Sequence, residues 1–326
     1  MNGLFRIPIR ERVKLYLKGV AMGAADVVPG VSGGTIAFIS GIYEELLSSI
    51  KAVGPGTITV LRRDGLAAAW RQINGDFLIT LLAGIATGVL LLVRPITWAL
   101  VHQPVMIWSF FFGLIVASVY LCGMLVRRWS VAPVVGLVIG TAIAFMIGMM
   151  NAAPTAGGLG FFFFAGMLAI CAMILPGISG SFILLLLGAY SPVMEAIKEI
   201  DIAVIAVFGT GCVLGLMAFS RFLSWLFQRH HDLVTATLTG FLLGSLIIVW
   251  PWKEVVSVRT VHEGTSKEEV VPFMRENVLP GEYSVITAND QLLGITDKEP
   301  HVLAAVVFMF VGAALLIVLD RLGRGR

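Results

Sequence analysis

Two glycine-rich strings interrupt apolar sequence and carry the residue types that bind an anion. They read Pro-Gly-Val-Ser-Gly-Gly at residues 29–34 and Pro-Gly-Ile-Ser-Gly-Ser at residues 176–181. Proline ends an incoming helix, glycine permits a tight reversal, and Ser32 and Ser179 stand where an N-cap would begin an outgoing helix. The following amides are expected to offer an anion hydrogen-bond donors and a positive helix-dipole end. The predicted binding set is Ser32, Gly33, Gly34, Thr35, Ser179, Gly180 and Ser181, with breaks at Pro29, Gly30, Pro176 and Gly177.

The two strings belong to an internal duplication. Residues 29–43 match residues 176–190 at seven of fifteen positions. A second series of matches, at a different offset, pairs Gly84, Gly88, Arg94, Trp98 and Gly113 with Gly211, Gly215, Arg221, Trp225 and Gly240. Small residues four apart allow close helix contact, so the helices that carry these glycines are predicted to pack against the broken segments. Paired interruptions in two halves of a chain indicate the binding site of a membrane transporter.

Composition places the chain in a membrane. It is 58% hydrophobic and 13% charged with a mean hydropathy of +0.93, whereas soluble domains contain roughly 25% charged residues. Six apolar windows are long enough to span a bilayer: residues 77–100, 105–126, 131–150, 202–227, 233–250 and 302–319. The sequence holds no nucleophile with a matched base, no zinc-ligand spacing and no phosphate-binding loop, so no enzyme, cofactor or metal site is expected. Nucleic acid is not an expected partner, because basic and aromatic residues do not interleave.

The charge distribution predicts the topology. Each broken segment is interpreted as a re-entrant hairpin of two half-helices, about fifteen residues each, which leaves three crossings in each half and inverts the second half. With a cytoplasmic N-terminus, 15 of the 23 Lys and Arg residues lie in cytoplasmic segments, while the outer segments hold 6 basic and 12 acidic residues. This bias follows the positive-inside rule. We therefore predict an all-α polytopic membrane protein with two inverted repeats, each one re-entrant helical hairpin plus three transmembrane helices.

The predicted repeats cover residues 1–150 and 155–326. Their hairpins lie at about residues 19–50 and 161–190, and three of the apolar windows follow in each half. Residues 251–301 form an extracytoplasmic insertion in the second repeat. Weak alternation at residues 283–287 predicts a small cap with strands there. Both termini are expected to be cytoplasmic.

Two arginines lie inside predicted spans. A charge within a span costs several kcal/mol unless it is paired or reaches the surface. The guanidinium groups of Arg94 and Arg221 suit a phosphate, which they can bind bidentately. The alternative is that each side chain extends to the nearer membrane interface, where Trp98 and Trp225 would also lie.

The carboxylate of Asp26 is a candidate for ion coupling or for a structural ion pair, and Met173 takes its place in the second half. The matched Tyr43 and Tyr190 are expected to cap the hairpins at the membrane interface. Two acidic residues that follow Tyr43, Glu44 and Glu45, are expected to be solvated.

The two glycine-rich strings and their neighbouring residues resemble those of a known family. Ala25-Asp26-Val-Val-Pro-Gly-Val-Ser-Gly-Gly-Thr35 with Gly41-Ile-Tyr43, and Leu175-Pro-Gly-Ile-Ser-Gly-Ser181 with Gly188-Ala-Tyr190, resemble the polyprenyl-phosphate translocases of PopT type. The resemblance implies a bacterial or archaeal inner-membrane flippase that returns undecaprenyl phosphate from the outer to the cytoplasmic leaflet for cell-envelope polymer synthesis.

Together these features predict alternating access, with the lipid phosphate held at the paired half-helix N-termini and by an arginine. Moving an anion against an inside-negative potential costs roughly 2.3 kcal/mol per charge per 100 mV, so coupling to protons or sodium is expected. A secondary transporter of a small soluble anion, or a non-transporting membrane scaffold, are the alternatives. A lateral opening beside Ser32 and Ser179 would favour the lipid over the soluble anion.

Overall fold

The computed structural model describes residues 7–28, 31–150, 157–261, 269–293, 295 and 298–324. The described residues of the first half form only helices: α1 (Ile9–Asp26), α2 (Gly33–Ile39), α3 (Tyr43–Ala52), α4 (Pro55–Asp64), α5 (Leu66–Gln72), α6 (Gly75–His102), α7 (Pro104–Gly123) and α8 (Val131–Met149). The second half contains α9 (Leu159–Ile174), α10 (Gly180–Leu186), α11 (Tyr190–Glu199), α12 (Ile202–Ser245), β1 (Lys253–Val261), β2 (Glu269–Asn277), α13 (Pro280–Tyr283), α14 (Ala288–Leu292) and α15 (Val302–Arg324).

The structure confirms an all-α polytopic membrane protein. Among the described helices, α6, α7, α8 and α12 are long and apolar enough to cross a membrane, and α10 with α11 forms an apolar pair bent by 107°. The predicted windows 202–227 and 233–250 form one element, α12, in which two helices meet at a kink, because His230 has the non-helical backbone angles φ −139° and ψ 52°. The kink lies between the two windows, as their separation in the sequence predicts, and the residues there include neither proline nor glycine. The sixth window is α15.

The predicted glycine faces pack as expected. Helix α6 lies along α1, and a Cβ at Gly84 would stand 2.3 Å from the Tyr16 carbonyl oxygen. Helix α12 lies along α9 in the same way, and a Cβ at Gly211 would stand 2.1 Å from the Phe163 carbonyl oxygen. Each glycine thus permits backbone contact that any larger residue would prevent. The duplication therefore extends from the sequence to helix packing.

The last long helix of each half, α8 in the first and α15 in the second, packs on the other half. Helix α15 lies along α7, where Gly312 approaches the Phe110 carbonyl, and α8 lies along α12, where Gly140 approaches the Thr237 carbonyl. Phe110 and Thr237 occupy matched positions, so the two contacts are equivalent. This exchange joins the halves through helix backbones. The inversion of one half relative to the other stays a prediction.

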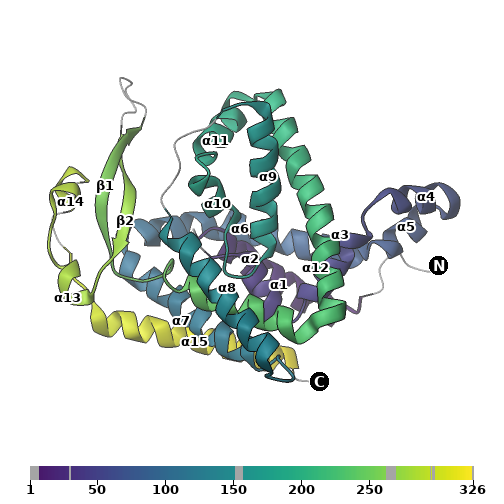
Figure 1. Cartoon of the computed structure of the whole chain (residues 1–326), viewed down its shortest axis with the longest axis horizontal. Helices are drawn as coiled ribbons and strands as arrows, with labels where there is room; N and C mark the ends of the chain where they lie inside the picture. The colour runs from purple at the N-terminus through teal and green to yellow at the C-terminus, as the bar shows by residue number, and fades with distance from the viewer. Residues whose placement is uncertain are drawn as a thin grey trace.

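The broken segments differ from the predicted hairpins in length. Helix α1 begins at Ile9, ten residues before the predicted boundary, and the outgoing helices α2 and α10 have seven residues each instead of about fifteen. The matched glycines Gly41 and Gly188 follow them with φ of 72° and 70°. This left-handed backbone suits glycine and ends the outgoing helices early. Helices α3 and α11 then continue in new directions (Figure 1).

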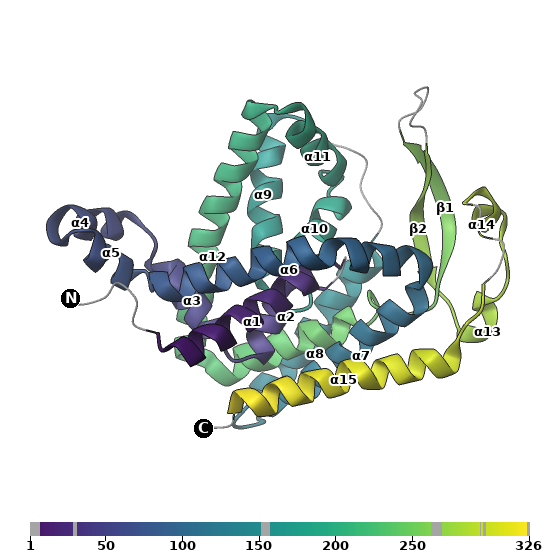
Figure 2. The same cartoon turned by 180° about the vertical axis from the view of Figure 1, so that it is seen from behind.

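The insertion contains strands, as predicted, but at other residues. Strands β1 and β2 form an antiparallel hairpin that projects from the helices in Figures 1 and 2. The predicted strand at residues 283–287 is wrong, because Tyr283 ends α13 and Thr287 caps α14. The Thr287 hydroxyl accepts a hydrogen bond from the Asp290 amide, which favours a helix start over a strand.

Candidate functional site

The two breaks meet inside the protein, and the first half satisfies the exposed backbone of the second. The Ser32 hydroxyl donates to the Met173 carbonyl at 2.9 Å, and the Tyr43 hydroxyl donates to the Ile174 carbonyl at 3.1 Å. These carbonyls belong to the last turn of α9, which has no helical partner for them. Tyr43 is therefore buried, not at the membrane interface as predicted, because its hydroxyl reaches the α9 end.

Two further contacts draw the breaks together. The Gly177 amide donates to the Thr35 hydroxyl at 2.9 Å. A Cβ at Gly34 would stand 2.5 Å from the Ile174 carbonyl oxygen, so only glycine permits this approach. Pro176 and Gly177 lie in the reversal between α9 and α10, where Gly177 has φ 84°. Pro29 and Gly30 lie outside the described residues.

The first break is closed by its own side chains. The Gly33 amide donates to Asp26 Oδ1 at 2.7 Å, and the Gly34 amide donates to the Ser32 hydroxyl at 3.1 Å. The Thr35 amide donates to the Ser32 carbonyl at 2.9 Å. All residues of α2 are buried. The Asp26 carboxylate thus occupies the place predicted for an external anion, and these three amides are not free to hold one.

The second break is open. Its serine hydroxyls, from Ser179 and Ser181, lie 2.8 Å apart, with Ser179 buried and Ser181 exposed. Ser179 occupies the predicted N-cap position, but its side chain makes no capping hydrogen bond. Within the described part of the chain, the amides of Gly180, Ser181 and Phe182 donate no hydrogen bond. The second break therefore offers donors that the first break has used.

The difference between the breaks comes from one substitution within the repeat. Met173 stands where the first half has Asp26, and a Cβ at Gly180 would lie 3.2 Å from the Met173 Cβ. A Cβ at Gly33 would lie 2.6 Å from Asp26 Oδ2. Both side chains therefore adjoin the first amide of the outgoing helix. A carboxylate fills this place in the first break, whereas in the second the nearest atoms are the Ala169 carbonyl oxygen, at 2.6 Å from a Cβ at Gly180, and the Met173 Cβ.

The predicted arginines do not contact the breaks. Arg94 is exposed on α6 and hydrogen bonds to no described residue. Arg221 donates to the Met217 carbonyl at 2.7 Å and to the Val53 carbonyl at 3.2 Å, where Val53 caps the C-terminus of α3. A guanidinium at a helix C-terminus is favourably placed against the helix dipole.

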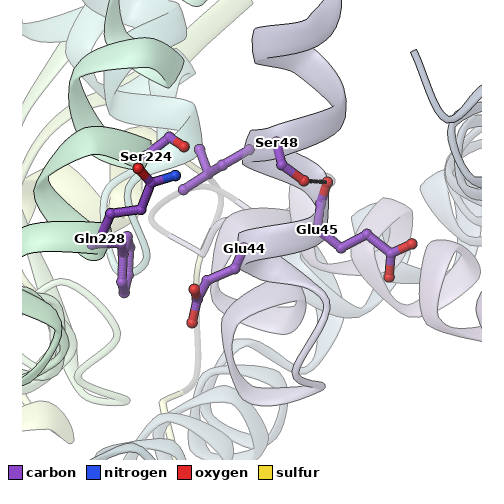
Figure 3. Close-up of a pocket in the computed structure, with 7 residues that line it drawn as sticks. Glu44, Glu45, Ser48, Ser224 and Gln228 are labelled. Carbon is purple, nitrogen blue, oxygen red and sulfur yellow. Dashed lines mark hydrogen bonds between the residues drawn. The ribbon is translucent and has the colours of Figure 1, made fainter. Parts of the chain in front are cut away.

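A cavity that sequence reasoning missed lies between α3 and α12. It has a volume of about 310 Å³ and is lined by Glu44, Glu45, Leu47, Ser48, Ser224, Phe227 and Gln228 (Figure 3). Glu44 lies 3.3 Å from His231 and Glu45 accepts from Asn74, so both carboxylates also have partners outside the cavity. The spacing of Arg221, Ser224 and Gln228 on one helix face was the available signal.

A helical membrane protein whose broken helices meet in its interior belongs to the class of membrane transporters. The chain matches the family described as "VCA0040-like: Undecaprenyl phosphate translocase-like" over residues 22–267. The chain belongs to this family and is a transporter, not an enzyme.

Two curated relatives carry the same name. The chain is 45% identical over 309 residues to a polyprenyl-phosphate transporter of Vibrio cholerae, covering 94% of this chain and 95% of the relative. It is 35% identical over 254 residues to a polyprenyl-phosphate transporter of Staphylococcus aureus, covering 72% of this chain and 85% of the relative. No solved structure matches the chain significantly.

Proposed function

We propose that the protein transports polyprenyl phosphate, and that it returns undecaprenyl phosphate from the outer to the cytoplasmic leaflet of the inner membrane for cell-envelope polymer synthesis. The names of the relatives support the substrate class. The proposed direction rests on the family resemblance and on the need to recover the carrier after its cargo has been used outside.

The open second break carries this proposal. The amides of Gly180 and Ser181 and the hydroxyls of Ser179 and Ser181 form a group of donors without a carboxylate. The first break shows that such an amide can bind an anionic group, since the matched Gly33 amide donates to the Asp26 carboxylate at 2.7 Å. A phosphate oxygen at the Gly180 amide would take the place of that carboxylate. Charge-assisted hydrogen bonds of this kind contribute about 1.5–3 kcal/mol each.

The first break supplies the coupling step of the proposal. The Gly33 amide becomes available to the phosphate only when Asp26 releases it. Protonation of Asp26, or sodium binding to its carboxylate, would release it. Uptake of a cation would also offset the cost of moving the phosphate across an inside-negative potential.

The arginines complete the proposed path. The described contacts of Arg221 are to carbonyl groups alone, so its charge is not neutralised by them. Arg94 is the matched residue of the first half. In the proposal, each guanidinium contacts the phosphate at one end of its route as the halves rock around the breaks.

The test is a leaflet-resolved assay of undecaprenyl phosphate in proteoliposomes, with and without a proton or sodium gradient. Replacing both serines, S179A/S181A, should slow transport at least about tenfold, because two phosphate donors are lost. D26N should remove the dependence on the gradient. S191A is the matched control, since Ser191 is exposed on α11, outside the breaks.

Three results would contradict the proposal. Transport at the wild-type rate by S179A/S181A would exclude the second break as the phosphate site. Uptake of inorganic phosphate without lipid movement would favour the soluble-anion transporter. Absence of any transport by wild-type protein under every gradient would favour the scaffold.

A further inference from the structure

An apolar groove on the outside of the protein lies away from the breaks. It has a volume of about 410 Å³ and runs between α7, α8 and α12, and its walls include Tyr120, Gly123, Trp129, Leu137 and Leu243. Tyr120 is 67% exposed and Trp129 is 49% exposed, so the groove opens to the outside of the protein. A concave apolar surface on the outside of membrane-spanning helices accepts a hydrocarbon chain.

Two arginines stand at the end of the groove. Arg127 and Arg128 precede Trp129 in the loop between α7 and α8. Their backbone amides donate to the two carboxylate oxygens of Asp232, at 3.2 and 3.1 Å, which holds the loop in place. Both side chains are exposed, and among the described residues their guanidinium groups have no hydrogen-bond partner, since only the backbone amides bond to Asp232. The held loop therefore carries two cationic side chains beside a surface that suits a lipid chain.

We infer that this groove binds polyprenyl phosphate, with an isoprenoid segment against Tyr120 and Leu243 and the phosphate on Arg127 and Arg128. The inference rests on the proposed function. Charge selects this lipid over bulk phospholipid: a phosphate monoester carries about −1.5 to −2 charges at neutral pH, which two guanidinium groups match. A phospholipid diester carries one negative charge and leaves the second arginine without a partner.

The position of the groove relative to the second break gives it a role in transport. Helix α12 presents Thr239 and Leu243 to the groove. Phe241, between them on the same segment, contacts the second break, where a Cβ at Gly177 would stand 2.8 Å from its carbonyl oxygen. One short stretch of α12 thus separates the groove from the break. The groove is a holding site for the lipid at the arginine-bearing end of its path.

The test counts lipids bound to the purified protein by native mass spectrometry. Wild-type protein should bind two molecules of undecaprenyl phosphate, and G123L should bind one. A Cβ at Gly123 would meet only the Trp129 ring, at 3.9 Å, so leucine fills the groove without displacing backbone. G209L is the matched control, because a Cβ there meets nothing within 4 Å, and it should bind two.

Two further variants separate this inference from the proposed function. S179A/S181A should lose the lipid at the break and keep the one in the groove, whereas R127Q/R128Q should do the reverse. Retention of both lipids by G123L would overturn the groove site. Equal occupancy of the groove by phosphatidylglycerol would also overturn it. If wild-type protein moves no lipid, the proposed function fails, and the lipid count still decides on the groove.

Discussion

Placing a carboxylate in the second break is the most direct test of how the breaks divide their roles. Asp26 holds the Gly33 amide at 2.7 Å, and Met173 stands in the matched position beside Gly180. The substitution M173D should therefore direct a carboxylate to the Gly180 amide. Met173 is 41% exposed, so the shorter side chain opens no cavity in a packed core and the protein should still fold.

The size of the effect follows from the bond that the phosphate would lose. A charge-assisted hydrogen bond to a backbone amide contributes about 1.5–3 kcal/mol, which corresponds to roughly a 10- to 150-fold loss of affinity. Repulsion between the carboxylate and the phosphate adds to this loss. The measurement is the dissociation constant of undecaprenyl phosphate, determined by thermophoresis in detergent micelles on purified protein that carries R127Q/R128Q, so that only the lipid at the break is counted.

The amide variant M173N is the matched control. It has the size of M173D without its charge, and it should bind within about threefold of wild type, because no full charge competes with the phosphate. Equal weakening in M173N and M173D would show that side-chain shape rather than charge is responsible. Unchanged affinity in M173D would refute the assignment of the phosphate to the second break.

Two further predictions concern stability. G84A should lower the free energy of unfolding by about 1–3 kcal/mol, because its Cβ would stand 2.3 Å from the Tyr16 carbonyl oxygen and push α1 from α6. Thermal unfolding in detergent measures this loss, and G209A, which has open space, should unfold no earlier than wild type. In the insertion, burial, with a contribution from Arg275, lowers the pKa of Lys253 from 10.5 to about 7. The unfolded insertion therefore binds more protons above about pH 7, and its free energy of unfolding should rise from about pH 7 to about pH 10. Chemical unfolding at several pH values should show this rise in wild type, and a rise of equal size in K253M would contradict it.

The sequence predicted those features that depend on a residue's own type and on the residues beside it in the chain. Ser32 is an N-cap because its hydroxyl reaches an amide two residues away. Gly84 and Gly211 lie at helix contacts because a missing side chain allows backbones to approach wherever two helices meet. The break of α12 at His230 lies between the two apolar windows, where the polar residues 228–232 interrupt the hydrophobic sequence.

The sequence by itself determined a duplicated, helical membrane protein with two glycine breaks, because apolar length, charge bias and repeated strings survive without knowledge of contacts. Only the tertiary structure decided which break is open. Asp26 closes the first break because the reversal returns α2 to the end of α1, and the hydroxyls of Ser32, Thr35 and Tyr43 bond to the second break from the other half. The three hydroxyl contacts join residues more than a hundred positions apart, and no local pattern predicts them.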